Sequence, residues 1–152
     1  LLAVGNTKIL PYTPEEQVRS VFDGEKPNEY GKIVLNFIRT LDHIFVSPVF
    51  AISNGLTNVL RYLVEEGLAT VNDRLPLVNP GETCPLLYHA AISDDSFSTF
   101  EYLLSCEGID VNIEVCDGIR LVHLCALSDS IPASHLKVLL RHPDIDVNAR
   151  DL

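Results

Sequence analysis

Apolar residues recur at helical spacing in three places along the chain, each time shortly before the dipeptide Val-Asn. The dipeptides are Val71-Asn72, Val111-Asn112 and Val147-Asn148, so they are 40 and 36 residues apart. The apolar positions before them follow the i, i+3, i+4 pattern of a helix that buries one face. They are Val59, Leu60, Leu63 and Val64, then Phe100, Leu103 and Leu104, then Leu136, Leu139 and Leu140. Recurrence at this period is typical of stacked helical repeats.

A shorter apolar segment precedes each of these predicted helices. The segments are residues 47–52, 85–91 and 120–126, and each is long enough for about two helical turns. Each unit is therefore predicted to contain a short helix, a longer helix, and then the Val-Asn dipeptide with a polar turn. We place the units at residues 46–79, 80–115 and 116–152.

The repeating unit resembles the ankyrin-repeat family, and the third unit carries the closest likeness. Asp117-Gly118 stands where the family opens its turn, His123 falls at the family's His, and Cys125-Ala126 stands at its Ala-Ala. The second unit keeps Ala90-Ala91, and the first keeps Ser47-Pro48 and a second helix that ends before Gly67. The resemblance covers residues 46–152. It implies an all-α fold, an ankyrin-repeat α-solenoid of stacked helix–turn–helix units with finger loops. It also implies that His123 hydrogen-bonds backbone near the turn.

Two regions depart from this pattern. Asn72 is 13 residues from Pro85, whereas Asn112 is 8 residues from Arg120, so the first finger loop is longer. Its two prolines, in residues 73–82, predict a stiffened, projecting finger. Residues 1–45 do not repeat the unit, and a helix that starts at Thr13-Pro14 and ends by Gly24 is expected there. We therefore expect a helical N-terminal cap or a degenerate repeat. The final residues enter another turn, which predicts a further repeat in the parent protein.

Composition narrows the functional classes. The chain has 152 residues, 47 % of them apolar and 21 % charged, with a formal net charge of -10. Residues 77–152 hold 4 basic and 12 acidic side chains and so carry most of the imbalance. This charge argues against nucleic acid and anionic membrane surfaces as partners. No apolar run approaches the length of a membrane-spanning helix. The four cysteines are expected to be reduced thiols in an intracellular, cytoplasmic protein, with the nucleus left open.

Candidate chemistry is sparse. Cys116, His123 and Cys125 are spaced unlike zinc ligands, and the chain has no Cys-x2-Cys pair. Neither a nucleophile-elbow nor a phosphate-loop glycine pattern occurs. We therefore expect no catalytic, cofactor-binding or metal-binding residues, and no enzymatic activity.

A partner-binding surface is the sharper hypothesis. The ankyrin resemblance implies a scaffold or adaptor that binds a protein through its finger loops and the concave face of its inner helices. An acidic rim would steer a basic or mixed-charge partner, although the same acids could serve only solubility. The apolar finger residues could form an interface or pack between the fingers. The candidate residues are Asp73, Arg74, Leu75, Leu77, Val78, Asp94, Asp95, Ile113, Glu114, Val115, Asp117 and Asp129. The alternative is a regulatory or targeting domain of a larger enzyme or channel. The oligomeric state is left open.

Overall fold

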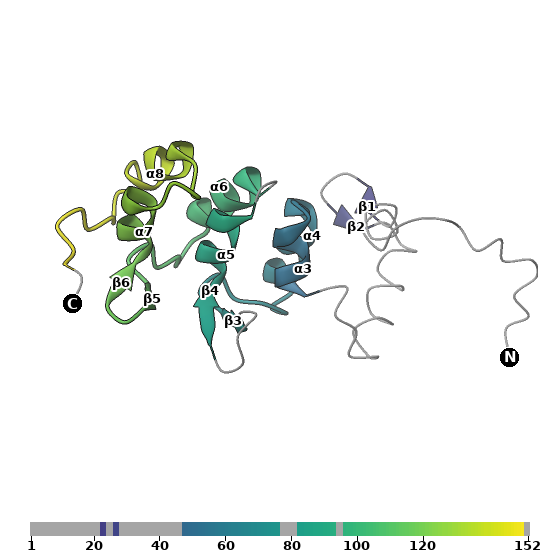
Figure 1. Ribbon diagram of the computed structural model, residues 1–152. Coiled ribbons are helices and arrows are strands. Elements are labelled where there is room, and N and C mark those ends of the chain that lie inside the picture. Colours follow the sequence, from purple (N-terminus) through teal and green to yellow (C-terminus); the bar gives the residue numbers. More distant parts are fainter. Residues whose placement is uncertain (1–21, 24–25, 28–46, 77–81, 94–95, 151–152) are drawn as a thin grey trace, which may run out of the picture.

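A computed structural model describes residues 22–23, 26–27, 47–76, 82–93 and 96–150 of the chain (Figure 1). Within these ranges the dominant elements are helices that come in consecutive pairs. The pairs are α3 (Pro48–Ser53) with α4 (Thr57–Glu65), α5 (Leu86–Ile92) with α6 (Phe97–Ser105), and α7 (Leu121–Leu127) with α8 (Ala133–Leu139). The helical periodicity of the sequence predicted a short helix followed by a second helix in each unit, and the positions of all six are confirmed.

The pairs stack so that like helices lie side by side. The first helix α3 packs on α5, while the second helices α4, α6 and α8 pack on one another in turn. In Figure 1 the first helices α3, α5 and α7 lie along the lower side of the stack and the second helices α4, α6 and α8 lie along the upper side. This arrangement leaves the segments between successive pairs on one side of the stack.

The expected all-α fold class is wrong, because the finger segments pair as β-hairpins. Three two-stranded antiparallel sheets occur among the described residues. They are β1 (Phe22–Asp23) with β2 (Lys26–Pro27), β3 (Arg74–Pro76) with β4 (Thr83–Pro85), and β5 (Glu114–Cys116) with β6 (Ile119–Arg120). The fold is therefore mixed: helix pairs joined by short β-ribbons. The physical reason is that partly buried backbone in the fingers must be hydrogen-bonded, and an antiparallel partner strand provides this.

The N-terminal cap or degenerate repeat expected over residues 1–45 is described at four residues only. Its described residues, Phe22–Asp23 and Lys26–Pro27, are short strands. The rest of residues 1–45, including the expected helix start at Thr13-Pro14, lies outside the described residues.

Local sequence signals explain where elements begin and end. The Ser47 side chain accepts a hydrogen bond from the Phe50 N–H at 3.2 Å, and Pro48 occupies the first turn, so α3 has a capped start. Gly67, with φ of +66°, follows α4 and donates to the Val64 carbonyl, while Leu68 donates to the Leu63 carbonyl. These two bonds form a Schellman motif, so the predicted glycine cap of α4 is confirmed.

The core is a continuous layer between the helix pairs. Leu60, Phe100, Leu103, Leu121 and Leu139 are fully buried, as the helical stripes predicted. Small residues at Ala51, Ala90 and Ala91 are buried between the first helices, where their size allows close approach. Leu140 departs from the pattern because it is 46 % exposed. Among the described residues, no helix combines the length and the hydropathy that crossing a bilayer would require.

Candidate functional site

One set of polar contacts between units joins the two finger hairpins, which we call finger 1 (β3–β4) and finger 2 (β5–β6). Arg74 of finger 1 lies at their junction. Its guanidinium donates to the Thr83 carbonyl at 2.8 Å within its own finger, and to the Glu114 and Val115 carbonyls of finger 2 at 2.6 and 2.8 Å. A planar guanidinium presents several donors in a fixed fork, so one side chain can hold several carbonyls in register. Arg74 therefore fixes the position of finger 2 relative to finger 1.

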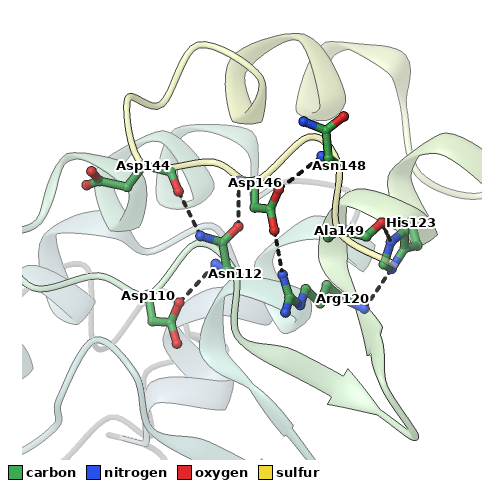
Figure 2. A network of polar contacts seen from close by, with 8 residues as sticks. All are labelled: Asp110, Asn112, Arg120, His123, Asp144, Asp146, Asn148 and Ala149. Carbon is green, nitrogen blue, oxygen red and sulfur yellow. Dashed lines mark hydrogen bonds and ion pairs between the residues drawn. The ribbon is translucent and has the colours of Figure 1, made fainter. Parts of the chain in front are cut away.

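Two asparagines form a second set of contacts between successive units, which we call the Asn clamps. Asn72 donates through Nδ2 to the Gly108 carbonyl at 2.8 Å and accepts through Oδ1 from the Asp110 N–H at 2.8 Å. Asn112 repeats both contacts one unit later, with the Asp144 carbonyl at 2.7 Å and the Asp146 N–H at 2.8 Å (Figure 2). Each carboxamide satisfies a peptide carbonyl and the N–H two residues further on. The clamps therefore set the spacing of the loops that close the units.

His123 joins finger 2 to the last described turn. Its Nδ1 accepts from the Arg120 N–H at 3.1 Å, and its Nε2 lies 2.9 Å from the Ala149 carbonyl (Figure 2). Because Nδ1 accepts, the proton must be on Nε2, which then donates to Ala149. The backbone-binding role that the ankyrin resemblance implied for His123 is thus confirmed. Arg120 adds an ion pair with Asp146 at 3.3 Å; both side chains are partly exposed, so this pair stabilises the loop only weakly.

The tip of finger 2 has a conformation that its sequence requires. Cys116 pairs with Ile119, which leaves Asp117 and Gly118 as a two-residue loop. Both loop residues have positive φ, 42° and 77°. A two-residue hairpin loop with this geometry is a type I′ turn, for which Asp-Gly is a favoured sequence. The turn leaves Asp117 exposed, beyond the ends of the two strands.

Of the predicted acidic residues that the structure describes, Asp73 holds its own loop together and the other three are exposed. Asp73 is used within its own loop, where its two carboxylate oxygens accept from the Thr70 N–H at 2.8 Å and from the Thr70 hydroxyl at 2.6 Å. Glu114, Asp117 and Asp129 are exposed. Asp94 and Asp95 lie outside the described residues.

The predicted apolar finger residues lie mostly inward. Val115 is 4 % exposed and belongs to the core, while Leu75 packs against that core and is half-buried. Ile113 is half-buried as well. Val115 therefore packs inside the protein and does not form part of an exposed interface. Leu77 and Val78 lie outside the described residues.

Two cysteines, Cys84 and Cys125, and two histidines, His89 and His135, are buried. Burial raises the pKa of the Cys84 thiol to about 11, although Arg74 opposes the shift, and burial raises that of Cys125 to about 11 as well. Burial lowers the pKa of His89 and of His135, so both rings are held neutral. Among the described residues, no three His, Cys, Asp or Glu side chains gather as a metal site would require.

Sequence reasoning did not foresee the roles of the bridging residues. Asn72 and Asn112 were noticed as a repeated dipeptide, but their amides were assigned no contact. The sequence did offer one indication, because an asparagine recurs at the same position of successive units. Stacking through apolar side chains alone does not require an asparagine there. Arg74 was taken as a partner-binding residue, whereas it makes its hydrogen bonds to the two fingers themselves.

Comparison of the chain with protein-family models, with curated proteins and with solved structures gives no match.

Proposed function

We propose that this protein is an interaction module of the ankyrin-repeat family, a scaffold or adaptor that binds a protein partner along its fingers and inner helices. The observation that carries the proposal is the bridging of finger 1 and finger 2 by Arg74. The bridge holds two β-hairpins side by side and leaves their outer polar side chains exposed. A partner that meets prealigned groups loses less conformational freedom on binding than one that must order them.

The exposed charges favour a basic partner. Glu114 and Asp117 lie on finger 2, and Asp129 lies in the connection between α7 and α8, all of them exposed. The chain as a whole carries a net charge of -10. Complementary charge at the rim of an interface mainly accelerates association and sets specificity. The proposed partner-binding surface of this protein is therefore polar and acidic at its edge.

A site-specific photo-crosslinking experiment tests the proposal. A photoreactive amino acid at Glu114 samples finger 2, and the same group at Glu101 samples the exposed side of α6 as a matched control. We expect a partner to be cross-linked from position 114 and not from position 101. Equal capture from both positions, or capture from position 101 alone, would place the interface elsewhere.

Charge reversal then tests the electrostatic part. Glu114→Lys combined with Asp117→Lys should weaken the binding of the cross-linked partner and flatten its dependence on NaCl concentration. Glu101→Lys changes the net charge in the same direction without altering the fingers, and it should have a smaller effect. If the finger variant binds the partner with unchanged affinity and salt dependence, these acids serve solubility only.

A further inference from the structure

Two cysteines lie at the junction between the fingers, one on each hairpin. Cys84 is in β4 of finger 1 and Cys116 is in β5 of finger 2. Strands β4 and β5 are neighbours in space although they belong to different hairpins. Both thiols are free in the structure.

The backbone next to these two cysteines is held together by one atom. Nη2 of Arg74 donates to the Thr83 carbonyl and to the Val115 carbonyl, each at 2.8 Å. These two carbonyl oxygens therefore lie no further apart than two hydrogen-bond lengths. Thr83 directly precedes Cys84, and Val115 directly precedes Cys116. The same side chain thus bridges the two strands that carry the cysteines.

The electrostatics of the two thiols is consistent with this placement of the strands. Cys116 is among the groups that raise the pKa of Cys84, after burial and the opposing effect of Arg74. The pKa of Tyr88 is raised chiefly by burial, and then by both thiols. Closure into a disulfide requires the two Cα atoms to lie about 4.4–6.8 Å apart.

The two thiols differ in access, which separates their chemical roles. Cys84 is 1 % exposed and Cys116 is exposed. A small oxidant in solvent can meet the Cys116 sulfur, whereas the Cys84 sulfur can react only with a group already beside it. An accessible thiol next to a second, resolving thiol is the arrangement typical of reversible cysteine oxidation.

We propose that Cys116 and Cys84 form a peroxide-oxidisable dithiol that closes into a disulfide between the fingers. The Cys116 thiolate attacks a peroxide oxygen, the O–O bond breaks, and Cys116 becomes a sulfenic acid with release of one water. The Cys84 sulfur then attacks the Cys116 sulfur and expels hydroxide, which takes up the proton lost by Cys84 and leaves as a second water. In sum, two thiols and one hydrogen peroxide give one disulfide and two waters. This site is independent of the proposed partner-binding function.

The second step should be slow at neutral pH. The reactive form of Cys84 is its thiolate, and a pKa of about 11 leaves that form scarce at pH 7. Each unit of pH below the pKa changes the thiolate fraction about tenfold. Closure of the disulfide from a preformed Cys116 sulfenic acid should therefore accelerate about tenfold from pH 7 to pH 8.

Peptide mapping of the oxidised full chain tests the proposal. The reduced protein is treated with hydrogen peroxide at low protein concentration, alkylated and mapped by mass spectrometry without reduction. We expect a linked Cys84–Cys116 peptide within one chain, reversible by dithiothreitol. A Cys106→Ser/Cys125→Ala variant should retain this link, since it removes the other two thiols and leaves the finger pair. Cys116→Ser should remove the link with an unchanged far-ultraviolet circular dichroism spectrum.

Three results would overturn the proposal. One is oxidation of Cys116 to sulfinic acid without any link to Cys84. Another is a Cys116–Cys116 bond between chains, whose yield would rise with protein concentration. The third is a linked peptide that joins Cys116 to Cys106 or Cys125 instead of Cys84. Because these readouts use the wild-type chain, the test does not depend on how the buried Cys84 tolerates substitution.

Discussion

The Asn clamps make a quantitative prediction about how the units hold together. Asn112→Ala removes a donor to the Asp144 carbonyl at 2.7 Å and an acceptor from the Asp146 N–H at 2.8 Å. A neutral intramolecular hydrogen bond contributes about 0.5–1.5 kcal/mol net to stability. The two contacts are exposed, so water partly replaces them. We therefore expect the free energy of unfolding to fall by about 1–2 kcal/mol.

The assay is urea unfolding of the full chain, followed by far-ultraviolet circular dichroism. In a repeat protein such a loss falls on the interface between neighbouring units, so the transition should also broaden as the third unit uncouples. Asn148→Ala is the matched control. It removes the same carboxamide from the same Val-Asn dipeptide, and the Asn148 side chain makes no hydrogen bond within the described residues. The control should change stability by less than about 0.5 kcal/mol.

A second variant separates the two halves of the clamp. Asn112→Asp keeps an acceptor for the Asp146 N–H, loses the donor to the Asp144 carbonyl, and adds a carboxylate near Asp110 and Asp146 (Figure 2). Its destabilisation should therefore shrink as NaCl screens the repulsion, whereas that of Asn112→Ala should not. Equal stability losses for Asn112→Ala and Asn148→Ala would refute the assignment of Asn112 as a clamp between units.

Three further predictions follow from individual side chains. Arg74→Lys keeps the charge but loses the planar fork, so we expect the free energy of unfolding in urea to fall by about 1–2 kcal/mol. The same substitution at the exposed Arg141 should leave that free energy unchanged. Equal stability of the two variants would exclude the Arg74 bridge. Burial lowers the pKa of His135, against a smaller opposing effect of the Pro132 backbone, so the folded ring stays neutral where the unfolded one is protonated. The contribution of His135 to the free energy of unfolding should then be complete above about pH 6.5 and decline as the pH falls below it. His135→Leu should reduce this decline. A pH profile that is the same in the variant and the wild type would contradict the lowered pKa of His135. Gly67→Ala should lower the free energy of unfolding by about 1–2 kcal/mol through the positive φ alone, because a Cβ there meets no atom within 4 Å. Gly67→Asn should lower it by less. Equal thermal stability of the wild type and both variants would be inconsistent with the Schellman motif.

The buried position of His135 explains why its pKa is lowered. Its ring lies edge-on to Phe97 and Phe100, with ring centroids 5.1 and 4.8 Å away. Neither ring nitrogen has a partner at hydrogen-bonding geometry. A cation there would lose its hydration without a counter-charge, which is the physical cause of the lowered pKa. The sequence alone shows only a histidine in a helical segment.

Helix positions were accessible from the sequence because they depend on local periodicity. The stripes that contain Leu60, Phe100 and Leu139 placed the second helices, since one buried face must recur every three to four residues. Gly67 and Gly118 were recognised for the same reason: a positive φ is a local property that glycine satisfies best. Ser47 likewise caps its helix through a contact only three residues away.

The hairpins and the bridges between them were decided by tertiary structure. The sequence of residues 73–85 reads as a proline-rich loop, and its pairing as a ribbon depends on partner residues seven to eleven positions away. Arg74 could equally have faced a partner protein. It faces finger 2 because the stacking of the helix pairs brings the Glu114 and Val115 carbonyls within its reach.

What the sequence by itself determined is the repeating unit: its period, its helix pairs and its turn glycines, all of which follow from contacts within a few residues. What only the tertiary structure decided is which polar groups face each other between units. The Asn clamps join residues 32 to 38 positions apart, and the Arg74 bridge joins residues 40 and 41 positions apart. Such contacts depend on how one unit sits on the next, which is fixed by core packing rather than by any local pattern.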